Sequence, residues 1–413
     1  MASSKKIEFK INPSRLNYLL NLYKLTKRDF LNLLNRGIKR DVVTLENLSN
    51  ILSRDKSVSE ILLKRIDKIF EKGITWYITN REISDVKKSS IFFRKDTFNS
   101  EIKFESIKIV HKYEELSTDI QILGNYVNFI PIKRIKKYKL SENPKVVASE
   151  VYEIVSAIEN SLVEKKIINK TKLGDSRGYL KNLIRTLEQL DIFVFEHLEM
   201  PQKKEKVNFN GFFIGPNIIV IKKQEYIRRE IFTLLHEFAH YILEQEEIDD
   251  LIEEREGFKS NKIEQWCHTF SFFFLLNDKK SYFEKLGRAS SKNDFYKKEI
   301  NNLYNSTFLS YSAFYTRLLM DKKIIKKDYD KIMDDISQIM KKSREDKKNN
   351  FKMENEKRKA MGKDPAFPVF KPIESHLFKE LVKINYFEGN INENSLREFL
   401  RIKPEKNIQE VIY

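Results

Sequence analysis

The spacing of apolar residues over residues 7–78 predicts several short helices. Within residues 12–25, apolar side chains recur every three or four positions, as they do on one face of a helix. Thr26 is a suitable N-cap for the next helix, and Gly73 is a natural stop for the last helix of this region. Several short basic helices in so short a stretch are typical of a helix-turn-helix module, although a purely helical packing domain has the same pattern.

The middle of the chain combines helical and strand patterns. Residues 99–145 are expected to form a helical connector that is broken by the apolar stretch 122–132. A new unit begins near Val146 with an amphipathic helix, and residues 192–195 have the composition of a strand. The stretch GFFIGPNIIVIKK (211–223) predicts two strands on either side of a Gly-Pro-Asn turn.

Helical patterns return in the second half of the chain. A helix that begins near Glu225 contains the stretch LLHEFAHYIL (234–243), and a second apolar helix over residues 262–277 follows an acidic connector. Residues 341–368 are dense in charge and nearly free of apolar periodicity, which predicts a solvated helix or a linker. A last helical segment is expected over residues 375–402.

Length and composition fit a soluble protein of several domains. A chain of 413 residues is expected to form two or three domains, and 41 % apolar residues are sufficient for sizeable cores. The single cysteine, Cys267, excludes an intramolecular disulfide and a multi-cysteine metal cluster. The apolar runs are too short to span a membrane, and the N-terminus lacks the apolar segment of a secretory signal, so we expect a cytoplasmic protein.

The net charge of +17 is concentrated toward the N-terminus. Residues 1–100 contain 21 Lys and Arg against 11 Asp and Glu, whereas the other 313 residues contain 56 against 49. A basic N-terminal quarter fits contact with nucleic acid, whose phosphates favour clustered Lys and Arg. A general bias toward lysine explains the same excess, because Lys, Ile and Asn are used heavily throughout. The sequence leaves both explanations open.

The stretch LLHEFAHYIL has the residue types and spacing of a zinc site. Positions i and i+4 of a helix are about 40° apart, so His236 and His240 project from one face and can reach one ion. Glu237 is turned roughly 100° from His236, which allows it to act as a general base on a water beside the metal without binding the metal itself. Chance produces an H-E-x-x-H match roughly 0.007 times in a chain of this composition, so we favour zinc over two core histidines.

A catalytic zinc needs a third protein ligand and an open fourth position. Glu264 is an acid on the apolar helix downstream of the motif, where a buried carboxylate needs a partner such as a metal. His268 lies four residues after Glu264 and shares its helical face. The histidines outside the motif are His111, His197, His268 and His376.

Two motifs resemble those of the ImmA/IrrE family of zinc endopeptidases. The first is FTLLHEFAHYIL, and the second is E-x-x-C-H-x-F-S, which begins at Glu264 and stands where the family has E-x-x-A-N-x-F-A. The resemblance implies that Glu264 is the third ligand. Cys267, His268 and Ser271 replace the usual Ala, Asn and Ala. Cys267 is expected to be a small buried residue, and His268 is expected beside the metal or in packing, with a role as ligand as the alternative.

The resemblance extends over residues 147–320. The basic lead into the motif helix is matched by Arg228, Arg229 and Phe232. The S-x-x-A-x-x-x-R-L element of the family is matched by Ser310, Ala313, Arg317 and Leu318. Upstream, the N-terminal helices resemble the repressor-type (XRE-like) helix-turn-helix, an arrangement that recurs in these relatives. The central link at residues 35–47 is longer than in that family, so the base-reading residues cannot be named.

These patterns predict a mainly helical α+β fold with four parts. We expect a helix-turn-helix-like basic domain over residues 1–85 and a helical connector over residues 86–146. A small-sheet, zincin-like (HExxH) peptidase domain is expected over residues 147–320. A charged linker and a C-terminal helical region are expected over residues 321–413.

The resemblance implies zinc-dependent hydrolysis of peptide bonds, with one Zn²⁺ per chain. In this reaction Glu237 would be the general base. The metal ligands would be His236, His240 and Glu264. The candidates for an oxyanion-stabilising or supporting role are His268, Tyr241 and Arg229. A substrate segment is expected to pair as a strand with residues 217–223, taken as an exposed sheet edge.

The family analogy also implies a protein substrate, namely a transcriptional repressor of stress, phage or mobile-element genes. Duplex DNA is a second expected partner through residues 1–85, and no membrane partner is expected. One alternative is a DNA-binding regulator whose zinc domain senses or scaffolds without proteolysis, and another is a zinc protein that docks a partner. The intact H-E-x-x-H favours the enzyme, because a structural zinc has no need of Glu237.

Overall fold

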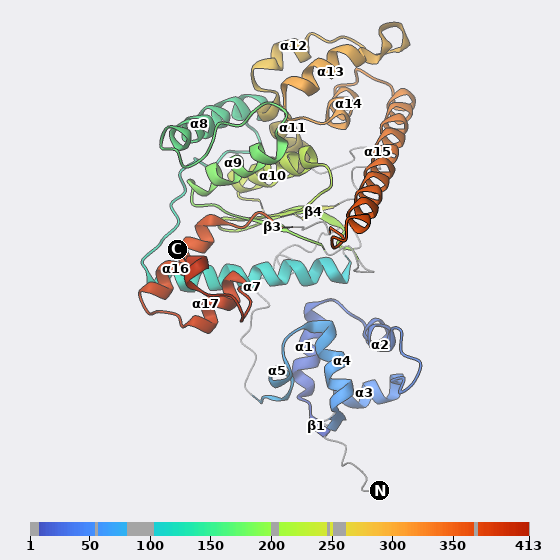
Figure 1. Cartoon of the computed structure of the whole chain (residues 1–413), viewed down its shortest axis with the longest axis vertical. Helices are drawn as coiled ribbons and strands as arrows, with labels where there is room; N and C mark the ends of the chain where they lie inside the picture. Colours follow the sequence, from blue (N-terminus) through green and yellow to red (C-terminus); the bar gives the residue numbers. More distant parts are fainter. Residues whose placement is uncertain are drawn as a thin grey trace. The chain divides into compact units, whose positions relative to one another are not determined.

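The computed structural model describes residues 8–53, 57–80, 103–199, 206–245, 248–250, 262–366 and 371–412. The chain divides into two compact units, Met1–Glu114 and Glu115–Tyr413, with the boundary inside helix α7 (Phe104–Tyr126) (Figure 1). The organisation in four parts that the sequence suggests is not tested by this division into two units and stays a prediction. Most of the expected acidic connector lies outside the described residues. In the described part of the chain, no helix combines the length and apolar content needed to cross a membrane.

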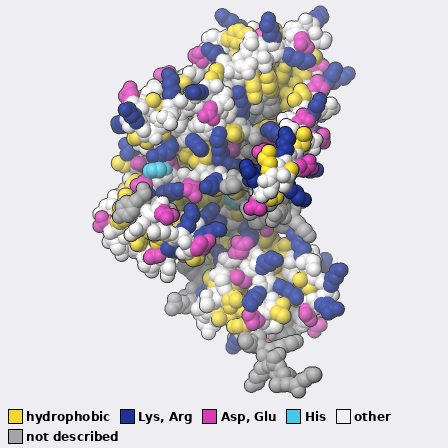
Figure 2. All heavy atoms as spheres, in the orientation of Figure 1, with side chains coloured by type: hydrophobic (Ala, Val, Ile, Leu, Met, Phe, Trp, Pro, Cys, Tyr) yellow, Lys and Arg dark blue, Asp and Glu magenta, His cyan; other side chains and the backbone are white. Residues whose placement is uncertain are grey.

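Charged side chains are frequent on the surface of the protein. On the face seen in Figure 2, Lys and Arg side chains are spread widely and interspersed with Asp and Glu. The net charge of +17 is therefore not gathered into a single patch on this face. The nucleic-acid and lysine-bias explanations of the basic N-terminal quarter both stay open.

The first unit is built from short helices and a pair of short antiparallel strands, β1 (Glu8–Lys10) and β2 (Ser57–Ser59). Its helices before α7 are α1 (Pro13–Leu22), α2 (Lys27–Asn35), α3 (Leu45–Ser53), α4 (Glu60–Phe70) and α5 (Ile74–Ile78). The predicted N-cap Thr26 is confirmed, because its hydroxyl accepts a hydrogen bond from the backbone N–H of Asp29 at 3.1 Å. α4 ends near Gly73, as expected: Glu71 caps it in the left-handed conformation at φ 56°, and Gly73 then precedes α5.

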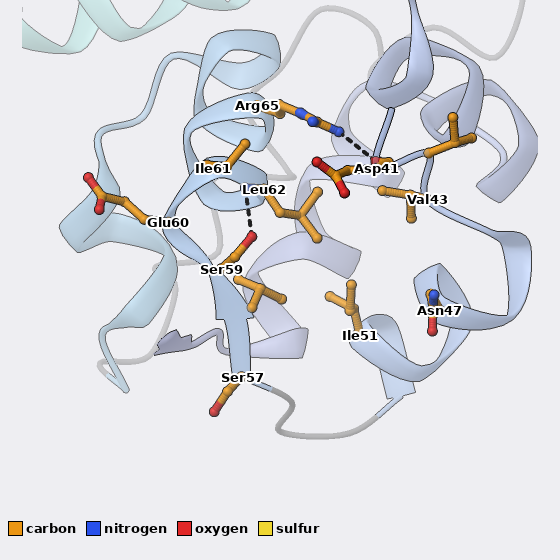
Figure 3. Close-up of a pocket in the computed structure, with 12 residues that line it drawn as sticks. Asp41, Val43, Asn47, Ile51, Ser57, Ser59, Glu60, Ile61, Leu62 and Arg65 are labelled. Carbon is orange, nitrogen blue, oxygen red and sulfur yellow. Dashed lines mark hydrogen bonds between the residues drawn. The ribbon is translucent and has the colours of Figure 1, made fainter. Parts of the chain in front are cut away.

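A long link separates α2 from α3, where a helix-turn-helix has its turn. It covers residues 36–44 and is fastened by Asn35, whose side chain donates to the carbonyl of Val43 and accepts from its N–H, both at 2.8 Å. A turn of about three or four residues is usual in that motif, so this unit departs from it as the sequence indicated. A cavity of about 490 Å³ lies between the link, α3 and the start of α4, and at its wall Arg65 donates to the carbonyl of Asp41 at 2.9 Å (Figure 3).

The second unit contains a small mixed sheet. Within the described residues the sheet has four strands in the order β3 (Phe193–His197), β5 (Ile218–Lys222), β4 (Phe209–Ile214) and β6 (Ile248–Asp250). β5 is parallel to β3 and antiparallel to β4, and β4 is antiparallel to β6. The predicted strand pair around the Gly-Pro-Asn turn and the mainly helical α+β fold are confirmed.

The expectation that residues 217–223 form an exposed sheet edge is wrong. β5, which occupies most of this stretch, lies inside the sheet, with β3 bonded on one side and β4 on the other. The physical reason is that β5 pairs in parallel with β3, a strand about 25 residues earlier in the chain. The local sequence of β5 carries no signal for this long-range pairing. β4 has β6 as its outer neighbour, with an irregular register between Phe209 and Phe212.

Side chains on both faces of β3, β4 and β5 are buried, which explains the nearly continuous apolar composition of these strands. Val194 and Ile221 share one core with helices α9 (Ser176–Glu188) and α10 (Ile227–Leu243), which cover one face (Figure 1). The ring of Phe195, adjacent to Val194 and therefore on the opposite face, contacts Phe378 at 5.6 Å. The helix that carries H-E-x-x-H therefore packs on one face of this sheet.

The remaining helices complete the second unit. They are α8 (Pro144–Glu164), α11 (Lys262–Leu276), α12 (Lys280–Glu284), α13 (Lys297–Ser306), α14 (Tyr311–Met320), α15 (Lys326–Ala360), α16 (His376–Phe387), α17 (Glu393–Leu400) and α18 (Gln409–Ile412). The break expected within residues 122–132 is confirmed, because α7 ends at Tyr126. The charge-dense segment expected after residue 341 forms the mostly exposed second half of α15.

Candidate metal centre

Three side chains of metal-ligand type converge where α10 packs against α11. His236 and His240 come from α10, and Glu264 comes from the first turn of α11. Nε2 of His236 lies 2.9 Å from Oε2 of Glu264 and 3.2 Å from Nε2 of His240. Nε2 of His240 also lies 3.2 Å from Oε1 of Glu264. The fold therefore brings the predicted ligands together from two helices.

This arrangement fits one divalent metal ion. Ligand atoms placed about 2.0–2.1 Å from a tetrahedral zinc lie about 3.3 Å from one another, and the observed separations of 2.9–3.2 Å are close to that value. Burial by itself would raise the pKa of Glu264, but the charges of His240 and His236 and their hydrogen bonds hold it well below its usual value. An ionised carboxylate beside two imidazoles is a donor set that suits zinc.

Glu237 occupies a fully buried position next to the ligands. Its exposed fraction is 0 %, and its side chain lies against strand β4. At the point of contact β4 carries Gly211, which has no side chain to displace the carboxylate. The Glu237 carboxylate is therefore shielded from bulk water.

His268 lies beside the ligand group without belonging to it. The ligand atoms that lie within 4.8 Å of one another come from the other three residues. The ring of His268 lies 4.9 Å from the ring of Phe232. Burial, together with the charges of His236 and Arg317, lowers the pKa of His268 to about 3. The imidazole is therefore neutral near neutral pH, as a packing or hydrogen-bonding residue.

Tyr241 and Arg229 lie on different parts of α10. The ring of Tyr241 is buried in the core, 5.8 Å from the ring of Phe213 and 6.0 Å from that of Phe238. Burial raises the pKa of Tyr241 to about 12. Arg229 lies two helical turns before His236 and therefore on the same side of α10. Their proposed part in stabilising an oxyanion stays a prediction.

The other histidines and Cys267 are not part of the converging group. His111 belongs to the first unit, where its Nδ1 lies 2.6 Å from Oε2 of Glu114. His197 ends β3, and His376 begins α16. Cys267 is fully buried, as the sequence indicated.

A second buried acidic cluster, at the start of α10, was missed by the sequence analysis. Glu230 is 0 % exposed and lies 3.4 Å from Nη1 of Arg177, which binds Glu196 of β3 in a two-pronged ion pair at 2.6 and 2.8 Å. Burial, followed by a hydrogen bond and repulsion from Glu196, raises the pKa of Glu230 to about 9. Acids within the apolar stretches FVFEH and IRREIF were the available signal.

Comparison with known proteins agrees with this geometry. Residues 187–307 match the sequence profile of Peptidase_M78, the IrrE N-terminal-like domain. The matched region runs from the end of α9 to α13 and includes the sheet and all three converging ligands. No solved structure matches the chain.

Proposed function

We propose that this chain, whose residues 187–307 are an IrrE N-terminal-like (M78) metallopeptidase domain, is a zinc-dependent endopeptidase. The observation that carries the proposal is the buried convergence of His236, His240 and Glu264 within that domain. Two neutral imidazoles and a carboxylate are the protein ligands of many catalytic zinc sites, in which the fourth position is left to water or substrate. Zinc is favoured over harder cations because two of the three donors are nitrogen atoms.

The residues of the chain have separate parts in the proposed reaction. A bound Zn²⁺ would supply Lewis-acid polarisation of the scissile carbonyl and would acidify water at the site. His236, His240 and Glu264 hold the ion, and their two helices are fixed by packing against each other. Glu237 accepts the proton of the attacking water and returns it to the leaving amine. Its burial limits the access of bulk solvent to that carboxylate.

The proposed substrate is a protein, and within that class a transcriptional repressor. The support is the resemblance to the ImmA/IrrE family together with the helical unit that precedes the peptidase domain. The substrate segment is expected near β4, because this strand lies directly against the helix that carries Glu237.

The proposal is tested with the purified full chain after zinc loading. Labelled casein is a general probe, and candidate repressors follow if casein is cut. Cleavage by the wild type but not by Glu237→Gln, with equal zinc content in both proteins, supports the endopeptidase. Equal cleavage by both proteins removes Glu237 from the mechanism. Stoichiometric zinc without any cleavage moves the assignment to the regulator whose zinc domain senses or scaffolds.

We also propose that the first unit contacts duplex DNA. The observation in favour is the set of exposed basic residues on α2 and on the following link, namely Lys27, Arg28, Arg36, Lys39 and Arg40. Phosphate contacts by such residues make binding strongly salt-dependent. In the full chain, changing Arg28, Lys39 and Arg40 to Gln should weaken binding. Each substitution that removes a phosphate-binding side chain should lower the slope of log affinity against log salt by about 1.

A matched control for this experiment lies on α15. Changing Lys347, Lys348 and Lys352 to Gln alters the net charge equally at exposed positions of the second unit. Equal weakening by both triple variants indicates a non-specific effect of charge. Absence of binding at low salt leaves the first unit as a protein-docking domain.

A further inference from the structure

Gly211 is the one glycine in strand β4, FNGFFI, and it is not there for its backbone conformation. Its φ is outside the left-handed region that favours glycine. It pairs regularly with Ile221 of β5 and lies in the buried interior. Glycine weakens a strand interior because it adds conformational entropy to the unfolded chain and contributes no packing. The reason for a glycine at this position is therefore sought in the side chains of α10 that pack against it.

The space above Gly211 is filled by two side chains of α10. A Cβ at this position would lie 2.8 Å from Cγ2 of Thr233, 2.9 Å from Cγ of Glu237 and 3.0 Å from Oε1 of Glu237. Real Cβ atoms essentially never make contacts shorter than 3.0 Å. The backbone of β4 at Gly211 therefore approaches Glu237, the proposed general base, more closely than any residue with a Cβ would allow.

We propose that Gly211 is a positioning residue for Glu237, an inference that rests on the proposed function for its catalytic meaning. A methyl group here has three atoms to displace, and they differ in how easily they move. Thr233 is β-branched, with a stiff χ1 torsion, and it is buried at 4 % exposure. The Glu237 side chain has more rotatable bonds. The carboxylate is thus the group that moves when this position gains a side chain.

The consequence is specific to the reaction. His236 and His240 bind through atoms on another side of α10, so rotation of the Glu237 side chain leaves the ligands in place. Gly211→Ala should therefore keep its zinc while losing the alignment of its base. A misplacement of about 1 Å of a catalytic group reduces rates strongly, to as little as about one hundredth.

The first test measures thermal unfolding of the metal-free protein and requires no activity. Gly211→Ala should lower the melting temperature by several degrees in the wild-type background. The decrease should be clearly smaller when Glu237→Ala is already present, because the two contacts to Glu237 have been removed. A decrease of the same size in both backgrounds shows that the residues do not interact and overturns the inference. Gly287→Ala is the matched control, since its nearest neighbour to an added Cβ is Tyr296 Oη at 3.4 Å.

The second test separates position from stability in the zinc-loaded protein. With labelled casein as the probe, Gly211→Ala should reduce kcat at least tenfold, with KM and zinc content near those of the wild type. Adding Thr233→Ser removes the 2.8 Å contact to Cγ2 and should recover melting temperature without recovering kcat. Full recovery of kcat by Thr233→Ser contradicts a role through Glu237. If the wild type cuts nothing, the endopeptidase proposal fails, whereas the first test still decides whether Gly211 sets the place of Glu237.

Discussion

Helix α10 contributes to two buried clusters that contain acids, one in its first turn and one two turns further along, and the two clusters differ in their charged partners. Glu230 and Glu237 are seven residues apart, lie on similar sides of the helix and are both 0 % exposed. At the Glu230 end, Arg177 supplies a cation and Gln224 donates its backbone N–H at 3.2 Å. At the Glu237 end, two imidazoles and a second carboxylate converge within hydrogen-bonding distance of one another.

The difference lies in the source of the positive charge at the two clusters. Arg177 and Lys223 balance the charge of Glu196, while Glu230, whose pKa is raised to about 9, keeps a proton; the cluster ties α9, β3 and α10 together. The charged partners that the structure gives Glu264 are His236 and His240. The Glu264 carboxylate thus depends on the two imidazoles that the proposed metal ion would bind, and a cation held by all three would balance its charge.

The largest expected effect separates Glu264 from His268, its neighbour one turn along α11. Loss of a residue that hydrogen-bonds to a metal ligand reduces metal affinity roughly 10–100-fold. Glu264→Ala removes a proposed ligand itself and should reduce zinc affinity by more than that. His268→Ala should stay within about tenfold of the wild type, because its imidazole lies outside the converging group. Zinc content after dialysis against graded chelator measures both. Retention of zinc by Glu264→Ala with loss in His268→Ala would reverse the assignment of the third ligand.

The next effect concerns the two glutamates near the C-terminal end of α10. Glu237→Gln should lower kcat by about 10²–10⁴-fold, the usual contribution of a general base, with zinc retained. Glu244→Gln is the matched control, because the same chemical change falls on an exposed residue paired with Lys133 and Lys137. Turnover of labelled casein and zinc content are measured on the same samples. Similar losses in both variants would point to general destabilisation.

A smaller effect is expected at the structural end of the helix. Arg177→Met leaves Glu196 and Glu230 buried without their main cation and should lower the free energy of unfolding by about 3 kcal/mol. Arg344→Met removes an exposed ion pair with Glu225 and should cost less than about 1 kcal/mol. Urea denaturation of the metal-free proteins measures both values. If the two costs are equal, the Glu196–Glu230 cluster does not hold the fold together.

A further effect at the same cluster is a dependence of stability on pH. Burial and Glu196 raise the pKa of Glu230 from 4.5 to about 9, so the folded protein binds a proton that the unfolded chain releases. This contribution is fully present below about pH 4.5 and is lost as pH rises through about 9. Glu230→Gln, which mimics the protonated form, should make the urea midpoint change less between about pH 6 and about pH 9.5 than in the wild type. An unchanged pH profile in this variant would show that Glu230 does not hold the proton.

Local patterns in the sequence determined most helices, the strand pair and two of the metal ligands. Helical periodicity, the N-cap Thr26 and the Gly-Pro-Asn turn depend on residues a few positions apart. The same holds for His236 and His240, because one helical turn places them side by side whatever the rest of the chain does. Glu264 came from a longer motif and needed the packing of α11 on α10 to reach the site.

Only the tertiary structure decided which segments meet. β5 is an interior strand because it pairs with β3 as well as with β4, and no local pattern in β5 predicts the pairing with β3. The close approach of Gly211 to Glu237 and the union of Glu230 with Glu196 and Arg177 join residues from separate elements. Sequence patterns reflect the periodicity of one helix or strand at a time. Contacts between elements depend on long-range packing. The same local patterns are compatible with more than one packing arrangement, so the sequence alone does not select one.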